Sequence, residues 1–210
     1  MGSTHYLGVP TPPAPPLAPA TSLSAEGGNA GLNASTSLTL LTINAAYAGV
    51  IGVAFVGAPE GSYIAEIIAS NVSCDNLEVA PVNLGKLTTG VGIGALVVDG
   101  NGDVKINSDT AHTADLSGLY VSALHASDCG LADISATVGL VPQTLHLDGN
   151  ALLVADIDNL LALAAAEATA NETVFAIDLS GGTNAAPSTP GGAASVVAIL
   201  AIEGATCVTN

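Results

Sequence analysis

The stretch that decides the fold is VSALHASDCGL, residues 121–131, read together with PQTLHLDGNAL, residues 142–152. The two segments align without gaps, with apolar residues at positions 4, 6 and 11 and an Asn or Cys at position 9. Positions 4 and 6 point to the same side of a strand because strand side chains alternate. An Asn or a small Cys at position 9 can hydrogen-bond or fill the following turn. The pattern therefore predicts short strands, each ending in a tight turn, stacked at an offset of 21 residues.

Two looser copies flank this pair: IGALVVDGNGD, residues 93–103, and FAIDLSGG, residues 175–182. The spacing is that of a leucine-rich repeat, LxxLxLxx(N/C)xL. Successive copies are offset by 28, 21 and 32 residues, which predicts a short and irregular solenoid. The predicted structural repeat positions are Leu96, Val98, Asn101, Leu124, Ala126, Cys129, Leu131, Leu145, Leu147, Asn150, Leu152, Ile177 and Leu179.

Helical patterns follow the clearest repeat. Residues 157–168 carry apolar side chains at helical spacing behind Asp156, a good N-cap, which predicts a helix of about three turns. A second apolar stripe around Val196 and Leu200 ends at Gly204, before a predicted strand over residues 206–208. Because a repeat stack exposes its last coil, we expect these elements to cap its open end.

The C-terminal region also resembles a known module. Its marks are DGNAL (148–152), a capping helix from near Asp156, the string DLSGGTNAAPS (178–188) and a last strand ending in Thr209 and Asn210. With these features, residues 120–210 resemble the leucine-rich-repeat-like C-terminal module of bacteriophage virion, prophage-encoded and bacterial surface proteins. That family usually has Lys and Trp around its final Gly, whereas Glu203 and Ala205 flank Gly204 here. The resemblance implies a structural role in a virion or on a cell surface.

Three segments are predicted, and together they give a mainly β chain with capping helices. Residues 1–27 are a Pro-rich extended arm, because Pro interrupts both helices and strand ladders. Residues 28–90 form a small β region, and residues 91–210 form the leucine-rich-repeat-like domain with its helix and strand cap. The arm is either a flexible linker or an anchor on a neighbouring subunit, and the β region could share the anchoring role. The arm prolines are Pro10, Pro12, Pro13, Pro15, Pro16 and Pro19.

Charge excludes several classes of partner. The 210 residues include 18 acidic and two basic ones, Lys86 and Lys105, for a formal net charge of −16. Duplex binding needs clustered Lys or Arg, so nucleic acid is excluded as a direct ligand. The longest apolar run, residues 193–202, is shorter than the roughly 20 residues of a membrane span, so no membrane partner is expected. Residues 1–19 lack the features of a secretory signal.

His125 and His146 occupy the same repeat position, so we predict that they lie on adjacent strands, about 5 Å apart on the solvent face. Asp178 follows in the next copy. A row of two imidazoles and a carboxylate could bind a transition metal, but polar residues on an exposed sheet face are the commoner outcome. We therefore predict no metal site and keep these three residues as weak metal candidates.

No catalytic residues and no cofactor are predicted. A second polar row lies two positions further along each copy and is interpreted as turn-capping: Asp99, Ser127, Asp148 and Ser180. The segment 99–103 begins like a calcium loop but lacks the required Gly and Glu, which favours a turn. No nucleophile elbow, HExxH or phosphate loop is present. The cysteines lack CxxC spacing and are expected to be buried thiols, with intersubunit disulfides left open: Cys74, Cys129 and Cys207.

These features predict a non-enzymatic structural protein of a bacteriophage virion, a capsid decoration protein that exposes its repeat domain on the virion surface. The expected partners are the major capsid protein or another virion protein, and further copies of the chain. The chain is short and lacks coiled-coil heptads, which favours decoration over a fibre. The alternative is a phage fibre component or a bacterial surface adhesion module, at the cell surface or extracellular, that binds protein or glycan.

Overall fold

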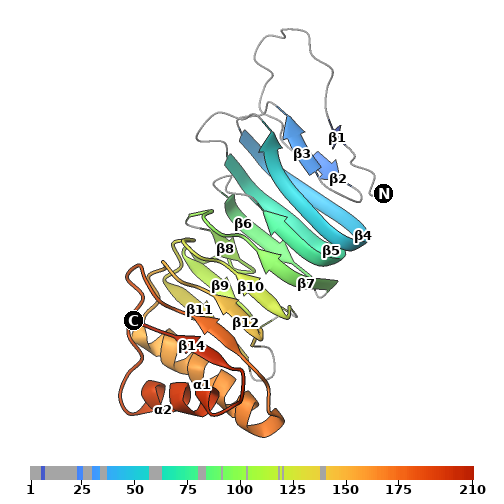
Figure 1. Ribbon diagram of the computed structural model, residues 1–210. Helices are drawn as coiled ribbons and strands as arrows, with labels where there is room; N and C mark the ends of the chain where they lie inside the picture. Colours follow the sequence, from blue (N-terminus) through green and yellow to red (C-terminus); the bar gives the residue numbers. More distant parts are fainter. Residues whose placement is uncertain are drawn as a thin grey trace.

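The computed structural model describes residues 6–7, 23–25, 30–33, 37–56, 63–79, 84–90, 92–102, 104–117, 119, 121–137 and 141–210. Within them the chain forms one large β-sheet with two helices near its C-terminal end (Figure 1). The strands are β1 (Tyr6–Leu7), β2 (Leu23–Ala25), β3 (Ala30–Asn33), β4 (Ser37–Val56), β5 (Tyr63–Val79), β6 (Leu84–Thr89), β7 (Gly92–Val97), β8 (Lys105–Ile106), β9 (Thr113–Asp115), β10 (Ala123–His125), β11 (Asp133–Ser135), β12 (Thr144–His146), β13 (Ala176–Asp178) and β14 (Thr206–Val208). The helices are α1 (Val154–Asn171) and α2 (Gly191–Leu200). Every pairing between described strands is parallel.

The long strand β5 is where the sheet branches. Along one edge, β5 pairs with β4 over most of its length. Along the other edge, the part around Ile67 pairs with β6, and the part around Leu77 pairs with β7. The sheet therefore curls at β5 and continues as two rows of strands (Figure 1).

We call the branch formed by β6, β8, β9 and β11 the lysine row, because it carries Lys86 and Lys105. The branch formed by β7, β10, β12, β13 and β14 is the histidine row, after His125 and His146. The chain moves back and forth between them, since β9 is followed by β10, β10 by β11 and β11 by β12. Successive passes of the chain thus extend both rows together.

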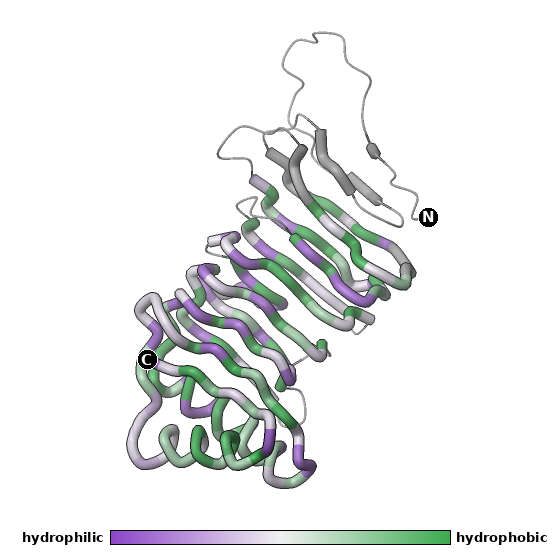
Figure 2. The backbone as a smooth tube through the Cα atoms, viewed as in Figure 1, coloured by the Kyte–Doolittle hydropathy of each residue, from purple (hydrophilic) through white to green (hydrophobic). Residues whose placement is uncertain are grey.

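The hydrophobic core brings the two rows together. Side chains in register on successive strands of the lysine row are buried: Leu87, Ile106, Ala114 and Ile134. The equivalent buried side chains of the histidine row are Leu96, Leu124, Leu145 and Ile177. All belong to one buried cluster that extends from Leu41 to Ile199. Figure 2 shows the accompanying alternation of hydrophobic and hydrophilic residues along the strands.

Helix α1 contains the predicted first helix and packs against β11, the last strand of the lysine row. Its buried face is the predicted apolar stripe with Ala165 added: Ile157, Leu160, Leu161, Ala164, Ala165 and Ala168. The predicted N-cap is wrong, because Leu153 occupies that position and Asp156 lies in the first turn. No side chain caps the first turn of α1.

Helix α2 packs against α1 and β14. It contains the predicted stripe around Val196 and ends at Leu200, a few residues before the predicted end at Gly204, and the strand predicted over residues 206–208 is confirmed as β14. The Asp158 carboxylate fixes the approach to α2, because its Oδ1 accepts a hydrogen bond from the Ser188 N–H at 2.8 Å. Neither helix in the described part of the chain combines the length and apolar character needed to cross a membrane.

The predicted fold class is right in being mainly β and wrong in its architecture. A leucine-rich-repeat solenoid takes one strand from each repeat, whereas here successive passes supply strands to both rows of one curled sheet. The physical reason is that apolar residues between the repeats, such as Ile106 and Ile134, pair as strands of the lysine row. The helices do not cap the whole sheet either, because α1 packs against β11 at the end of the lysine row while the histidine row continues to β14. They connect β12 to β13 and β13 to β14, and the sheet continues past both.

The predicted boundary at residue 90 is crossed by both the sheet and the core. Leu77 of β5 lies in register with Leu96 of β7, and both belong to the single buried cluster. Within the predicted arm, the described strands β1 and β2 pair with β3 and β4. The six arm prolines, between Pro10 and Pro19, lie outside the described residues.

Candidate functional site

Two stacked histidines lie on the outward side of the histidine row. His125 on β10 is in register with His146 on β12, and the ring centroids are 4.4 Å apart with planes at 10°. The residues on both sides of His125, Leu124 and Ala126, are fully buried, so strand alternation directs the imidazole outward. Asp178 on β13 lies in register with His146 and continues the row.

The metal candidates His125, His146 and Asp178 are thus consecutive members of one row. The Asp178 carboxylate turns toward its own strand end, where Oδ1 accepts hydrogen bonds from the Ser180 N–H at 3.0 Å and the Ser180 hydroxyl at 2.6 Å. In the described part of the chain, no group of three or more His, Cys, Asp or Glu side chains is placed to hold a metal ion. The row has the properties of a polar sheet face with an aromatic stack.

The second polar row joins successive turns of the chain. Asp99 Oδ1 accepts a hydrogen bond from the Ser127 N–H at 2.7 Å, and the Ser127 hydroxyl donates to Asp148 Oδ1 at 2.6 Å. Backbone bonds run beside them, since Gly149 N donates to Ser180 O at 2.9 Å. These hydroxyls and carboxylates therefore bond one another across the turns. Asp103, at the end of the calcium-like segment, lies outside the described residues.

A third set of polar groups is buried beneath the turns. Asn150 is 2% exposed, and its side-chain amide forms four hydrogen bonds of 3.1 Å or less with backbone groups. Nδ2 donates to Leu147 O and Ala126 O, both at 2.8 Å. Oδ1 accepts from the N–H groups of Cys129 and Leu131, at 3.1 and 3.0 Å. One amide thus ties its own turn to the preceding turn, which explains why Asn suits this position of the repeat.

Similar contacts to the preceding turn recur along the histidine row, and we call them the asparagine ladder: the buried Asn101, Asn150 and Asn184 and the exposed Asn210, with Cys129 at the second place. Asn101 Nδ2 donates to Val98 O at 2.8 Å and to Val79 O, one turn earlier, at 3.0 Å. Cys129 Sγ lies 3.0 Å from Val98 O and makes the corresponding contact to the preceding turn. The ladder therefore runs through the repeat positions to the last residue of the chain.

Asn184 and Asn210 are ladder residues that the repeat pattern missed. Asn184 donates to Leu179 O at 3.0 Å and to Leu147 O at 2.9 Å, and it stands five residues after Leu179, whereas Asn150 stands three after Leu147. Gly181 and Gly182 account for the difference, because both adopt positive φ, 71° and 56°, and widen this turn. The sequence does contain a signal for Asn184, because this residue is the Asn of the SGGTN string, but it stands two positions later than the repeat pattern requires.

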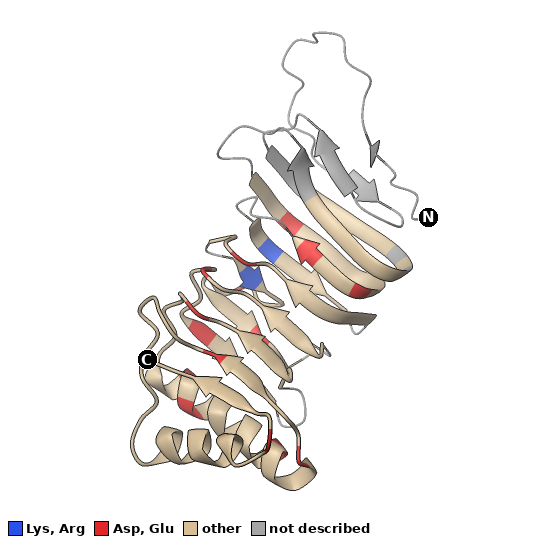
Figure 3. Ribbon diagram, in the orientation of Figure 1, with Lys and Arg blue, Asp and Glu red and all other residues tan. Residues whose placement is uncertain are grey.

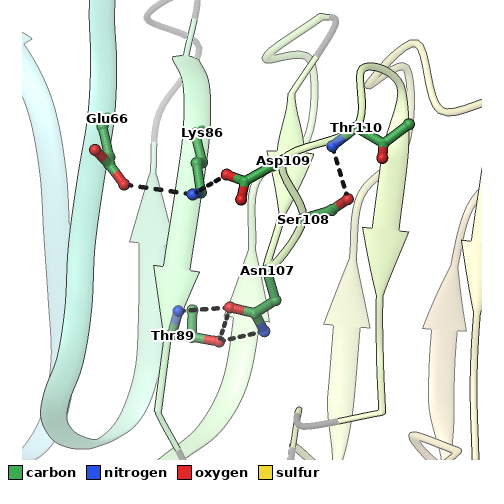
Figure 4. A network of polar contacts seen from close by, with 7 residues as sticks. All are labelled: Glu66, Lys86, Thr89, Asn107, Ser108, Asp109 and Thr110. Atoms are coloured by element: carbon green, nitrogen blue, oxygen red, sulfur yellow. Dashed lines mark hydrogen bonds and ion pairs between the residues drawn. The ribbon is translucent and has the colours of Figure 1, made fainter.

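The lysine row carries an exposed ion-pair network on its outward side (Figure 4). Lys86 Nζ lies 2.5 Å from Asp109 Oδ1 and 3.7 Å from Glu66 Oε1. The hydrogen bond between Lys86 and Asp109 raises the pKa of the lysine and lowers the pKa of the carboxyl group. Beside it, Asn107 Oδ1 accepts from the Thr89 N–H at 2.8 Å and fixes the following turn. No motif joins these residues, so the sequence carries no signal for the network.

Two carboxyl groups meet where α1 joins the lysine row. Burial raises the pKa of Asp156, in the first turn of α1, and the neighbouring Asp133 carboxylate on β11 raises it further. A shared hydrogen bond with Asp133 acts in the same direction. This junction therefore favours the protonated form of Asp156 and is a point where acidity affects the stability of the fold.

All three cysteines are free thiols. Cys74 and Cys129 are buried, as predicted, and Cys207 on β14 is partly buried. Burial raises the pKa of Cys129 and that of Cys207 to about 11. Both thiols are therefore protonated at neutral pH, which makes them weak nucleophiles.

The outward rows and the turn residues offer different chemistry. The turn hydroxyls, carboxylates and amides bond within the fold, while the stacked imidazoles face outward from the sheet. The arrangement is suited to stiffness and surface contact. Among known proteins, no family model, no curated sequence and no solved structure matches this chain.

Proposed function

We propose that this chain is a non-enzymatic structural protein of a bacteriophage virion, in the role of a capsid decoration protein. The structural role is supported by the turn side chains, which form hydrogen bonds within the protein itself. Ser127 bonds both Asp99 and Asp148, and Asn150 bonds four backbone groups. A catalytic group must keep a donor or acceptor directed at a substrate. These side chains instead hold the turns together, which supports a role in rigid display.

The virion setting is supported by the resemblance of DLSGGTNAAPS, residues 178–188, to a module of phage proteins. In this chain the string contains Asn184, a member of the asparagine ladder. The residues that resemble the phage module therefore include one that stabilises a turn. The N-terminal part, including residues 1–27, would attach the chain to the major capsid protein or another virion protein. With a net charge of −16, the attachment surface on that partner is expected to be basic or neutral.

A phage fibre component or a bacterial surface adhesion module is the second candidate. The observation that favours it is the stack of His125 and His146, which presents aromatic rings beside Asp178 on an outward sheet face. Rings and carboxylates of this kind can contact a glycan or a protein loop. In that role the histidine row would be the binding face.

Particle composition tests the proposal. Virions are purified from a lysate of the phage or prophage that encodes the chain, and the chain is counted against the major capsid protein by quantitative mass spectrometry. We expect a fixed ratio set by capsid geometry. Deleting residues 1–27 should abolish incorporation. Because the deletion also removes the strands β1 and β2, a thermal melt verifies that the rest of the sheet is retained. Recovery of the chain in the cell-surface fraction, with none on particles, would contradict decoration and support adhesion.

A further inference from the structure

The exposed face of α2 is apolar and uncharged. Its two large exposed side chains, Val197 and Leu200, lie three residues apart and therefore project from the same side of the helix. Val197 is 69% exposed and Leu200 is 48% exposed. Neighbouring exposed apolar side chains of this kind mark a surface that a partner can cover.

The neighbouring strand β14 leaves an open sheet edge. It is the last strand of the histidine row and pairs only with β13 among the described strands. On that side, Thr206 N donates to Phe175 O and Val208 O accepts from Leu179 N. Because strand groups alternate, the N–H and C=O of Cys207 point toward the open edge. Val208 is 50% exposed, and no Lys, Pro or bulge protects β14 from a further strand.

The distribution of charge indicates which partner would bind at α2 and β14. From residue 179 to residue 210 the sequence has one charged side chain, Glu203, whereas the remainder carries nearly all of the net charge of −16. Figure 3 shows the acidic residues along both rows and none on α2. Two copies that approach through the middle of the sheet, residues 60–178, bring carboxylates together, because 16 of the 18 acidic residues lie there, and a basic partner would choose that part. A neutral apolar end therefore suits a second copy.

The open edge is also self-complementary. Two β14 strands related by a twofold axis run antiparallel, and Cys207 of each can exchange both backbone hydrogen bonds with the other. A strand of three residues provides few such bonds, so the apolar face of α2 must supply most of the association.

We propose that a second copy of this chain docks end to end through α2 and the edge of β14, forming a twofold dimer with a continuous sheet. The dimer does not depend on the virion setting. It would also present its two N-terminal parts at opposite ends, because β4 and β14 lie at opposite ends of the sheet (Figure 1).

Sedimentation velocity of the full chain from low to high micromolar concentration tests the dimer. Val197→Asp should weaken association by about tenfold or more, because it places a charge in an apolar contact. Val50→Asp is the matched control, since Val50 is 41% exposed on β4, far from α2 in the sheet order. Thermal melts of both variants verify that the fold is retained.

Hydrogen exchange at the Cys207 amide gives an independent readout of the strand contact. We expect slow exchange at high concentration and fast exchange at low concentration, and Val197→Asp should abolish the protection. A wild-type chain that stays monomeric throughout overturns the proposal. So does association that both Asp variants weaken equally, because the effect would then come from net charge alone.

Discussion

The two rows that diverge from β5 use equally short strands but hold their register differently. In the histidine row, buried polar groups of the asparagine ladder, such as Asn150, bond successive turns. In the lysine row, register depends on apolar side chains such as Ile106 and Ile134, together with polar contacts that are only partly buried or exposed, such as Asn107–Thr89 and Lys86–Asp109. A buried amide must be satisfied at a fixed place, whereas apolar packing tolerates several spacings. A recognisable repeat therefore arises where the register depends on a polar group.

The largest expected effect comes from removing one amide of the ladder. Asn150→Ala leaves Ala126 O and the N–H groups of Cys129 and Leu131 without their side-chain partner, whereas Leu147 O keeps its bond from Asn184. Each buried group left without a partner costs about 1–3 kcal/mol, so the free energy of unfolding should fall by about 3 kcal/mol or more. Urea unfolding followed by circular dichroism measures it. Cys129→Ala, at the same position one turn earlier, loses only weak thiol contacts and should cost about 1 kcal/mol. Equal losses would mean that the ladder does not hold the register.

Core truncations test whether the two rows share one core. Leu145→Ala in the histidine row and Ile134→Ala in the lysine row should each lower the free energy of unfolding by about 2–5 kcal/mol. His146→Ala, at the outward alternate position, should cost within about 0.5 kcal/mol. The measurement is again chemical denaturation. A response confined to Leu145 would contradict the shared core, and small effects at Leu124, Leu145 and Leu147 alike would contradict the strand register.

The ion pairs of the lysine row are expected to contribute less. Lys86→Met removes the contacts with Asp109 and Glu66, and exposed ion pairs of this kind stabilise a fold only slightly because water and salt screen them. With a net charge of −16, the wild-type melting temperature should rise from low to moderate salt as repulsion is screened. The rise should be larger in Lys86→Met, because that variant has lost an attraction and gained net negative charge. A melting temperature that falls with salt would contradict this view of the charges.

The smallest expected effect concerns the junction between the lysine row and α1. Because the pKa of Asp156 is raised in the folded state, its ionised form destabilises the fold above that pKa, and the penalty disappears as pH falls through it. Asp133→Asn removes the repelling charge and should stabilise the protein at neutral pH by less than about 1 kcal/mol. Melting curves at neutral and acidic pH should show the gain only at neutral pH. A gain that persists in acid would require another cause.

The contrast between the rows also explains what could be predicted from the sequence. Leu124 pairs with Leu145, and His125 with His146, as the 21-residue offset implies, and the buried face of α1 follows from helical spacing. The lysine row was missed because Ile106 and Ile134 lie in strands of only two or three residues, and no repeated sequence pattern marks these strands. Asn184 was missed because two glycines shift it within its turn.

The asparagine ladder also determines how such a protein can change length over evolution. Each amide bonds only its own turn and the one before it, so one complete turn can be inserted or deleted without altering the bonds of distant turns. The offsets of 28, 21 and 32 residues between paired strands show that the connecting segments already differ in length while the pairing stays in register. Homologues should therefore differ by whole turns, with Asn or a small residue such as Cys at the ladder position of each added turn.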